Sequence, residues 1–220
     1  MNTQLLQTAL KMPDAALFLS ELQKALQEEN AKRLHFYNVI DENKKMEFIN
    51  GVIVFHSPVM KRHNNATGLL YSLMNMYAEL TEQGFVGIEK IMISLTRNDY
   101  EPDICFFPES LAKTFTETQM QFPAPTWIVE VLSKSTAKND RTVKFQDYAA
   151  HGVREYWIID PDTGTVEQYS LRKGKYDLLL KAKDGMISSL ALKGFSIPIR
   201  AIFHRKENSI ALRQMLEKSK

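Results

Sequence analysis

The sequence predicts a mixed α/β domain, in which helices flank a central mixed sheet and an antiparallel meander follows. Three observations support this fold class. Residues 126–160 run from a β-branched segment through a helical segment into a second β-rich segment, and such a crossover usually joins parallel neighbours. Asn50-Gly51 separates two alternating apolar segments, which is a strong hairpin signal. Three short strand-like segments, 165–171, 175–182 and 186–192, then indicate the meander.

The N-terminal part predicts one helix followed by strands. Residues 13–30 place apolar side chains at the helical period, and Pro13-Asp14 suits the first turn. Residues 35–40 and 46–57 alternate apolar and polar side chains, which is typical of strands. Pro58 then interrupts the strand pattern.

The remaining elements follow from the same patterns. We expect helices at residues 61–82 and 136–152, the second closed by Gly152, and a short final helix at 208–219. We expect strands at 84–96, 103–108, 126–133 and 154–160, with a turn at 97–102. The predicted organisation is an N-terminal helical extension (1–33), a main domain (34–200) and a basic C-terminal segment (201–220).

Composition limits the class of protein. Apolar residues make up 44% of the 220 and charged residues 25%, as in an ordinary globular protein with a core. The longest apolar runs are far shorter than the roughly 18 residues of a membrane helix, and the N-terminus lacks a signal-peptide pattern. We therefore expect a cytoplasmic protein. The single Cys105 excludes an internal disulfide and a cysteine-rich zinc site.

The net charge of +2 does not indicate nucleic acid binding over the whole surface. The charge is uneven, however, because residues 193–220 contain seven Lys or Arg and two Glu, 7 − 2 = +5. Such a basic segment either contacts phosphates or is a solvated surface. The second interpretation is favoured on composition alone.

Glu130 is the most unusual residue of the predicted sheet. It lies in the β-rich segment 126–133, where an ionised carboxylate is costly unless it is paired or binds a cation. Asp140, Lys144 and Tyr148 follow at i, i+4 and i+8 on the next helix, so Lys144 can approach Glu130. The alternatives are a structural Glu130 that is simply paired with a buried Arg or Lys, and an Asp140–Lys144 ion pair on the surface.

Asp103, at the start of the strand 103–108, supplies a second carboxylate. Two carboxylates from neighbouring strands and a lysine suit metal-assisted phosphodiester hydrolysis. Mg²⁺ commonly takes one or two carboxylates and completes its shell with water and substrate phosphate. The metal lowers the pKa of an attacking water and neutralises developing charge, and a lysine adds fixed positive charge. Asp103, Glu130 and Lys144 form this set.

The motifs that carry this set resemble a known family. Pro102-Asp103, "VEVLSKST" at 129–136 and "DRTVKFQDYAAHGVREYWIIDP" at 140–161 are similar to the Uma family of candidate restriction endonucleases, in the PD-(D/E)xK nuclease superfamily. The likeness covers roughly residues 47–169. It implies a restriction-endonuclease-like sheet, Asp103 and Glu130 as catalytic metal ligands for Mg²⁺ or Mn²⁺, Lys144 as the active-site lysine, and DNA as the substrate.

Two departures from the superfamily pattern concern the lysine. Leu132 stands two residues after Glu130, where the superfamily lysine is expected, so the resemblance implies that the helix position of Lys144 takes over this role. Lys134 occupies a position at which the family often has proline. Because side chains alternate along a strand, Lys134 shares the face of Glu130 and is a second candidate for the lysine role.

Glu47 and the start of the helix 61–82 supply further candidates. Glu47 matches an acidic position of the family and is a possible third metal ligand, or else an edge-strand charge that opposes aggregation. Lys61, Arg62 and His63 lie at a helix start, where anions are favoured, and are candidates for nucleic acid contacts. His63 can equally be a local hydrogen-bonding or surface residue.

Other polar and aromatic residues have structural interpretations. We expect Tyr148 to pack its helix on the sheet, Asp160 to form the turn "DPDTG", and Cys105 to belong to the core. The leading function is a Mg²⁺-dependent DNA endonuclease acting as a homodimer, since two-fold symmetric sites suit cleavage of both strands. The alternatives are a non-catalytic DNA-binding or scaffold protein that keeps the fold, and a hydrolase for RNA or a small phosphorylated substrate.

Overall fold

The computed structural model describes residues 3–41 and 44–218. It divides into two compact units. The first consists of Met1–His56 with Leu95–Tyr100, and the second of Ser57–Ser94 with Glu101–Lys220. Within the described residues, no helix is long and apolar enough to cross a membrane. Ser219 and Lys220, the end of the predicted basic segment, lie outside the described residues.

The first unit contains two helices and three short strands: α1 (Thr3–Leu10), α2 (Ala15–Val39), β1 (Met46–Ile49), β2 (Val52–Phe55) and β5 (Asp99–Tyr100). β1 pairs antiparallel with β2 on one side and β5 on the other. Asn50 and Gly51 form the turn between β1 and β2 with φ of 49° and 81°. Positive φ at both central residues is the geometry of the tight hairpin turn that Asn-Gly favours. The hairpin prediction is confirmed.

The predicted strand at residues 35–40 is wrong, because α2 continues to Val39. Arg33, Phe36 and Tyr37 are spaced three and four residues apart on the helix, so all three side chains contact the strands β1 and β5. Arg33 Nε donates to Asp99 Oδ2 over 2.6 Å, and the Tyr37 hydroxyl donates to Asp99 Oδ1 over 2.9 Å. Phe36 is buried with its ring 5.8 Å from that of Phe48. These contacts stabilise the helical conformation of this segment, although its alternating apolar and polar side chains favour a strand.

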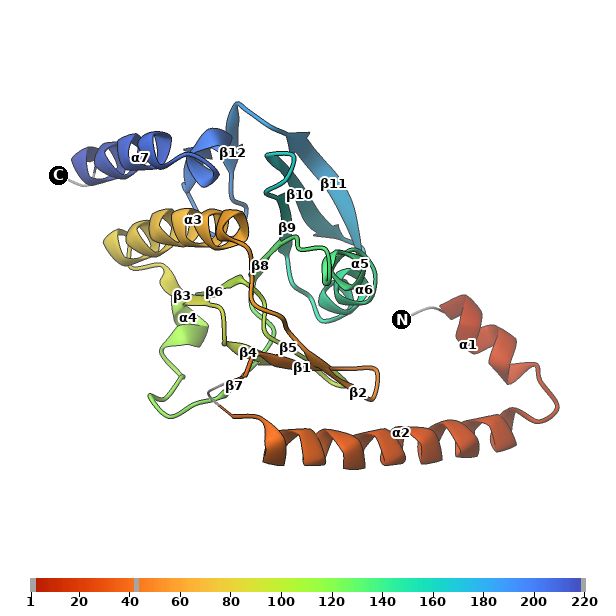
Figure 1. Cartoon of the computed structure of the whole chain (residues 1–220). Helices are drawn as coiled ribbons and strands as arrows, with labels where there is room; N and C mark the ends of the chain where they lie inside the picture. Colours follow the sequence, from red (N-terminus) through yellow and green to blue (C-terminus); the bar gives the residue numbers. More distant parts are fainter. Residues whose placement is uncertain (1–2, 42–43, 219–220) are drawn as a thin grey trace. The chain divides into compact units, whose positions relative to one another are not determined.

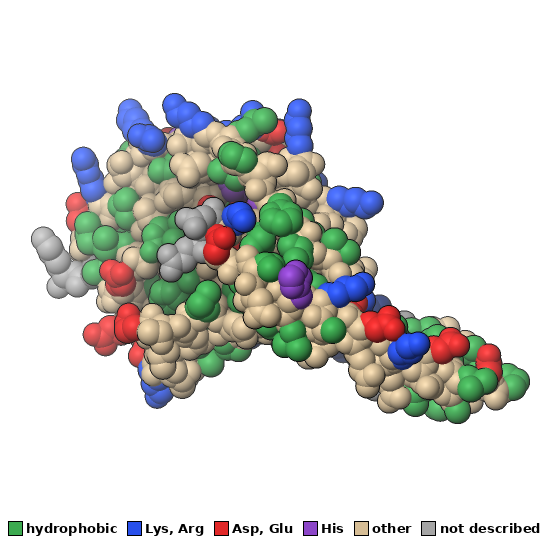
Figure 2. Space-filling model, turned by 60° about the horizontal axis from the view of Figure 1, so that its bottom comes forward, with side chains coloured by type: hydrophobic (Ala, Val, Ile, Leu, Met, Phe, Trp, Pro, Cys, Tyr) green, Lys and Arg blue, Asp and Glu red, His purple; other side chains and the backbone are tan. Residues whose placement is uncertain are grey.

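The N-terminal half of α2 exposes an apolar surface. Leu19, Leu22 and Leu26 are 53%, 44% and 43% exposed, although the same helix face farther along carries Phe36 into the core of this unit. Figure 2 shows hydrophobic side chains (green) at the surface among charged ones. The helix predicted at residues 13–30 therefore forms, and its apolar side is left open to solvent.

The second unit is built on a six-stranded sheet in the order β11-β10-β9-β8-β6-β3. β8 and β9 are parallel, and the other neighbours are antiparallel. The crossover that joins β8 to β9 was predicted from the sequence and is confirmed. The bounds of the six strands are β3 (Gly84–Ile88), β6 (Ile104–Pro108), β8 (Trp127–Val131), β9 (Glu155–Asp160), β10 (Thr165–Arg172) and β11 (Lys175–Ala182).

The other elements of this unit are mostly helices. They are α3 (Lys61–Leu80), β4 (Met92–Ser94), α4 (Glu109–Ala112), β7 (Gln121–Phe122), α5 (Ala137–Arg141), α6 (Val143–Ala150), β12 (Met186–Ser188), β13 (Ser196–Pro198), the 3₁₀ helix η1 (Ile199–Ile202) and α7 (Arg205–Lys218). The short strand β4 pairs in parallel with β7. The predicted mixed α/β fold with helices flanking mixed sheets is confirmed.

Several boundaries differ from the prediction. The turn expected at 97–102 contains β5, and the final helix, α7, begins at Arg205 rather than at residue 208. The segment 84–96 divides into β3 and β4 at a turn where Glu89 has φ 59°. The helix expected at 136–152 breaks into α5 and α6 at Thr142, whose φ and ψ are −125° and −87°. The third meander strand was wrongly placed, because residues 186–188 pair with 196–198 in a separate two-stranded sheet. Gly152, at φ 80°, closes α6 as expected.

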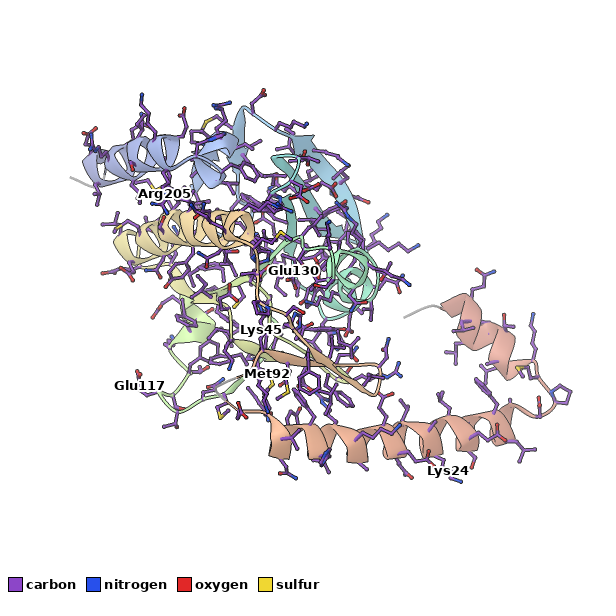
Figure 3. All side chains as sticks on the ribbon, in the orientation of Figure 1. Lys24, Lys45, Met92, Glu117, Glu130 and Arg205 are labelled. Carbon is purple, nitrogen blue, oxygen red and sulfur yellow. The ribbon has the colours of Figure 1, made fainter. Side chains whose placement is uncertain are left out.

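Alternation along β8 separates two faces of the main sheet. Trp127, Val129 and Val131 join the large hydrophobic core together with α3, η1 and α7. In Figure 1, α3 and α7 lie side by side on that face. Glu130 points to the opposite face, because successive side chains alternate, and there it meets α6. The sheet thereby presents one carboxylate to the side where α5 and α6 lie (Figure 3).

Candidate active site

Pairing of β6 with β8 brings the two predicted metal ligands together. Ile104 pairs with Val129 and Cys105 with Ile128 in this antiparallel register. Continuing the register by one residue sets Asp103 opposite Glu130. Directly opposite residues of an antiparallel pair share a face, with Cβ atoms about 4.5–5.5 Å apart. The sheet geometry therefore places both carboxylates side by side at the end of β8.

Asp103 is held from two directions. The backbone N–H of Val131 donates to its Oδ2 over 2.7 Å. Nε2 of His63, from the first turn of α3, lies 3.3 Å from the same oxygen. Asp103 and His63 are both buried, with exposed fractions of 5% each. The carboxylate is thus fixed in position by one backbone and one side-chain contact.

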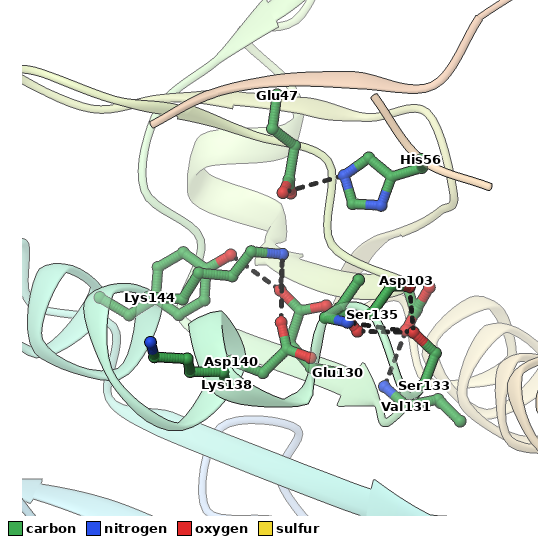
Figure 4. Close-up of polar contacts among 12 residues, drawn as sticks. Glu47, His56, Asp103, Glu130, Val131, Ser133, Ser135, Lys138, Asp140 and Lys144 are labelled. Carbon is green, nitrogen blue, oxygen red and sulfur yellow. Dashed lines mark hydrogen bonds and ion pairs between the residues drawn. The ribbon is translucent and has the colours of Figure 1, made fainter. Parts of the chain in front are cut away.

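Glu130 receives two donors from α6. Lys144 Nζ donates to Glu130 Oε1 over 3.1 Å, and the Tyr148 hydroxyl donates to the same oxygen over 2.9 Å (Figure 4). Lys144 and Tyr148 are one helical turn apart, which is why both reach one carboxylate. All three side chains are buried. The predicted approach of Lys144 to Glu130 is therefore present in the structure, and so is the pairing with a buried lysine that the structural alternative expected.

Asp140 adds a third carboxylate to this group. Its Oδ1 lies 3.4 Å from Lys144 Nζ, and the exposed fractions of the two side chains are 1% and 2%. The alternative of an Asp140–Lys144 ion pair on the surface is wrong, because the pair is buried and Lys144 bridges Asp140 and Glu130 (Figure 4). Of the lysines and arginines that the structure describes, Lys144 alone is buried.

Hydrogen bonds to the sheet hold α5, and the break between α5 and α6 at Thr142, in place. Arg141 donates through Nη1 and Nη2 to the two oxygens of Glu167 on β10, over 2.7 and 3.1 Å. Burial opposes ionisation of Glu167, but hydrogen bonds from Arg141, Tyr169 and Lys181 lower its pKa to about 2. The buried Tyr156 hydroxyl donates to the backbone oxygen of Asp140 over 2.9 Å. These bonds fix the position from which Asp140 and Lys144 enter the site.

Burial and the site carboxylates suppress ionisation of nearby neutral groups. Burial raises the pKa of the Cys105 thiol, and the charge of Glu130 adds to that effect. Burial likewise raises the pKa of Tyr156 well above its usual value, with Glu130 and Asp140 contributing. Both groups are neutral at ordinary pH, so neither is a nucleophile. Cys105 has an exposed fraction of 0%, consistent with its predicted place in the core.

The remaining predicted residues of this unit lie around the site with different environments. Lys134 follows the end of β8 and is exposed. Lys61, at the start of α3, is exposed too. Arg62 forms an ion pair with Asp162. His63 is not a surface residue as one alternative supposed, since it is buried against Asp103.

Glu47 lies in the first unit, on β1. It is buried, with an exposed fraction of 1%, and its Oε2 is 3.0 Å from Nε2 of His56. The alternative interpretation as an edge-strand charge is wrong, because β1 has a neighbour on each side and the side chain is not at the surface. Its role as a further metal ligand stays a prediction.

Some features of the candidate site were not predicted from the sequence. The burial of Asp140 and the contact of His63 with Asp103 depend on packing of distant segments, for which the sequence carries no local signal. Tyr148 was expected to pack on the sheet, and its spacing of four from Lys144 was the signal for a common target. Asp160 accepts the backbone N–H groups of Asp162 and Thr163 over 2.9 and 3.2 Å, so its predicted role in the turn is confirmed.

The donor set suits a hard divalent cation that keeps most of its water. Among the described residues, no group of three or more His, Cys, Asp or Glu is arranged to hold a metal ion. Asp103 and Glu130 form a two-carboxylate set. Mg²⁺ is commonly bound through one or two carboxylates, with water and substrate phosphate completing its shell.

Comparisons with known proteins identify the family and the fold of this chain. A cyanobacterial protein from Synechocystis sp., named "Uncharacterized protein sll1609", is 30% identical over 128 residues, which cover 57% of this chain and 72% of that protein. The crystal structure of "a putative nuclease belonging to DUF820" from Anabaena variabilis matches with a TM-score of 0.66 and 20% identity, over 76% of this chain and 94% of that one. This second likeness concerns the fold. Residues 28–200 match the family model described as "Uma2: Putative restriction endonuclease", and the chain therefore belongs to the Uma2 family.

Proposed function

We propose that this protein is a divalent-metal-dependent endonuclease that hydrolyses phosphodiester bonds of DNA. The observation that carries the proposal is the pair of buried carboxylates, Asp103 and Glu130, on neighbouring strands beside the buried Lys144. Membership of a family described as restriction endonucleases supports the same activity. The metal is Mg²⁺, for which Mn²⁺ is expected to substitute.

The charge balance supports cation binding. Asp103, Glu130 and Asp140 are carboxylates with exposed fractions of 5%, 4% and 1%, and the buried basic groups beside them are the Lys144 ammonium and the His63 imidazole. Buried negative charge in excess of positive charge is costly, and a bound cation relieves that cost. A divalent ion on Asp103 and Glu130 would offset this excess.

Each residue has a distinct proposed role. A bound Mg²⁺ would lower the pKa of an attacking water and neutralise charge that develops on the phosphate. Asp103 and Glu130 would hold the metal, and the contacts of Asp103 with His63 and the Val131 N–H orient its carboxylate. Lys144 fixes Glu130 and supplies a positive charge that is already in place before the reaction.

Tyr148 is a positioning residue in this proposal. Its hydroxyl donates to the same Glu130 oxygen as Lys144, so the carboxylate is held by two donors from one helix. A carboxylate with its rotamer fixed in this way binds a metal without losing further side-chain freedom. Asp140 shares the Lys144 ammonium and thereby fixes the lysine.

We infer that the protein, besides binding DNA, pairs with another copy of its own chain to form a homodimer. Leu19, Leu22 and Leu26 continue at spacings of three and four along α2, which is the spacing of a coiled-coil seam. The positions flanking this seam, Ala16, Phe18, Gln23, Ala25 and Asn30, carry no charge. Two copies of this face can therefore pair without repulsion between like charges. Such pairing would supply two sites for the two strands of a duplex.

The activity is tested with purified protein and supercoiled plasmid DNA. We expect conversion to nicked and linear forms with Mg²⁺ or Mn²⁺, and none with EDTA. Glu130→Gln keeps the shape of the side chain and its hydrogen bonds but removes its charge, so we expect a loss of activity of at least 10²-fold. Lys138→Ala, at an exposed position of α5, is the matched control and keeps full activity.

Two results would count against the proposal. Cleavage that survives both EDTA and Glu130→Gln would exclude this site as its source. DNA binding without cleavage under any divalent ion would support the alternative, a DNA-binding protein that keeps the nuclease fold without turnover. Parallel assays with RNA and nucleotide substrates would decide the third alternative, a hydrolase acting on those molecules.

A further inference from the structure

A cavity of about 280 Å³ opens beside the Asp103 end of the candidate site. His63, which contacts Asp103, is part of its lining, so the cavity and the carboxylate pair share a residue. The turn that follows β8 contributes Ser133, Lys134 and Ser135 to the lining. All of the lining residues belong to the second unit. The cavity is therefore adjacent to the place where we propose that the scissile phosphate binds.

The turn after β8 is ordered by its own hydroxyl groups. Ser133 Oγ lies 3.1 Å from Ser135 Oγ and 3.0 Å from Thr136 Oγ1, and it accepts the Thr136 backbone N–H over 3.3 Å. Figure 4 shows Ser133 and Ser135 on this turn, next to Asp103. Hydroxyl groups both donate and accept, so they can turn their hydrogens towards phosphate oxygens. Lys134 adds a positive charge to the same part of the lining.

The lining also contains apolar residues. They are Pro58, Val59, Met60 and Leu132, of which Val59 and Met60 are 45% and 55% exposed. Arg62 and Asp162 also line the cavity and form an ion pair with each other, which offsets the negative charge of Asp162. The cavity thus combines a lysine and hydroxyl groups with apolar side chains. A single nucleotide has a matching combination of an anionic and a less polar part.

We propose that this cavity binds one nucleotide of the substrate strand, next to the scissile phosphate, with Lys134 as its phosphate contact. The inference rests on the proposed nuclease function and adds to it the position of the neighbouring nucleotide. The volume of about 280 Å³ lies just below the range of about 300–1,000 Å³ that is usual for ligand pockets, so the cavity has room for no more than one nucleotide. Lys134 is then a binding residue, and the active-site lysine is Lys144.

Binding of a labelled DNA duplex at several salt concentrations, in EDTA, tests this role without any cleavage. Each phosphate neutralised by a protein cation adds about 0.9 to the slope of log K against log salt for duplex DNA. We expect Lys134→Ala to weaken binding and to reduce the slope by about that amount. Lys138→Ala, four residues away, exposed and outside the cavity, should leave both unchanged. Equal slopes for the two variants would overturn the proposal.

A competition assay tests the nucleotide itself. We expect deoxythymidine monophosphate to displace the duplex at lower concentration than inorganic phosphate does, and Met60→Ser to remove this difference. Equal potency of the two probes on the wild-type protein would contradict a nucleotide site. Both measurements concern binding, so they stand apart from the cleavage assay. A slope change in a protein that never cleaves would leave the cavity proposal intact and refute the nuclease.

Discussion

Substitution of Lys144 by methionine removes the buried positive charge between two carboxylates. Lys144 Nζ lies 3.1 Å from Glu130 and 3.4 Å from Asp140. At an effective dielectric constant of about 20, each contact amounts to about 5 kcal/mol of Coulomb energy. Removing the ammonium also removes its own desolvation penalty, so the measured loss is smaller. Breaking a buried pair by removing one partner costs about 3–5 kcal/mol, and this is the loss of stability that we expect.

The assay is urea unfolding of the wild type, Lys144→Met and Lys138→Met in EDTA at pH 8. The control removes an exposed lysine and should change the free energy of unfolding by less than about 0.5 kcal/mol. A deficit for Lys144→Met no larger than that of Lys138→Met would refute our assignment of Lys144 as the cation of a buried cluster.

Three further predictions concern other parts of the molecule. The pKa of Glu167 is lowered to about 2 from 4.5, so its contribution to stability is present above about pH 4.5 and is lost as the pH falls towards 2. Glu167→Gln should consequently unfold more easily than the wild type at pH 7, by about 1–3 kcal/mol, with the difference closing in acid; thermal unfolding from pH 7 to pH 3 measures this, and a pH-independent difference would contradict it. Cys105 is buried and its thiol pKa is raised, so a disulfide reagent at pH 8 should react with the folded protein far more slowly than with the urea-unfolded protein; equal rates would show that the thiol is accessible. Leu22→Glu places a charge within the exposed α2 seam and should turn a dimer into a monomer in light scattering, whereas Gln23→Glu, beside the seam, serves as the milder comparison; a wild-type monomer, or a dimer unaffected by Leu22→Glu, would exclude the seam as the interface.

Much of the central architecture could be predicted because it follows from local patterns and chain topology. The strand, helix and strand at residues 126–160 predicted the parallel pair β8 and β9. Alternation along β8 predicted that Glu130 would point away from its valine neighbours. The position of Asp103 at the start of a strand made it a candidate for the second carboxylate, from a strand next to that of Glu130. Lys144 and Tyr148 are four residues apart on one helix, and both side chains therefore reach the carboxylate of Glu130.

The errors come from places where distant contacts override local pattern. Residues 35–40 alternate like a strand, but Arg33 and Tyr37 bond to Asp99, more than 60 residues away, and keep the segment helical. Residues 186–188 pair with 196–198 rather than with the meander. Both outcomes depend on pairing partners that no local window contains.

The site itself was only partly visible in the sequence for the same reason. Asp103, Glu130 and Lys144 were recognised as a group by residue type and family resemblance. The contact of His63 with Asp103 joins residues 40 positions apart and depends on how α3 packs on the sheet. A surface position for Asp140 stayed open as an alternative because the break at Thr142 and the Arg141–Glu167 bond, which bring α5 against the sheet, have no sequence signature.

The central claim is that Asp103 and Glu130 together bind a divalent metal ion. The most direct test is anomalous diffraction from crystals of the protein grown or soaked with Mn²⁺. The account predicts one strong anomalous peak within ligand distance of a carboxylate oxygen of both Asp103 and Glu130, with Lys144 beside it, and no such peak for Glu130→Gln. Active protein with no peak at this position, or with its metal bound elsewhere, would contradict the account.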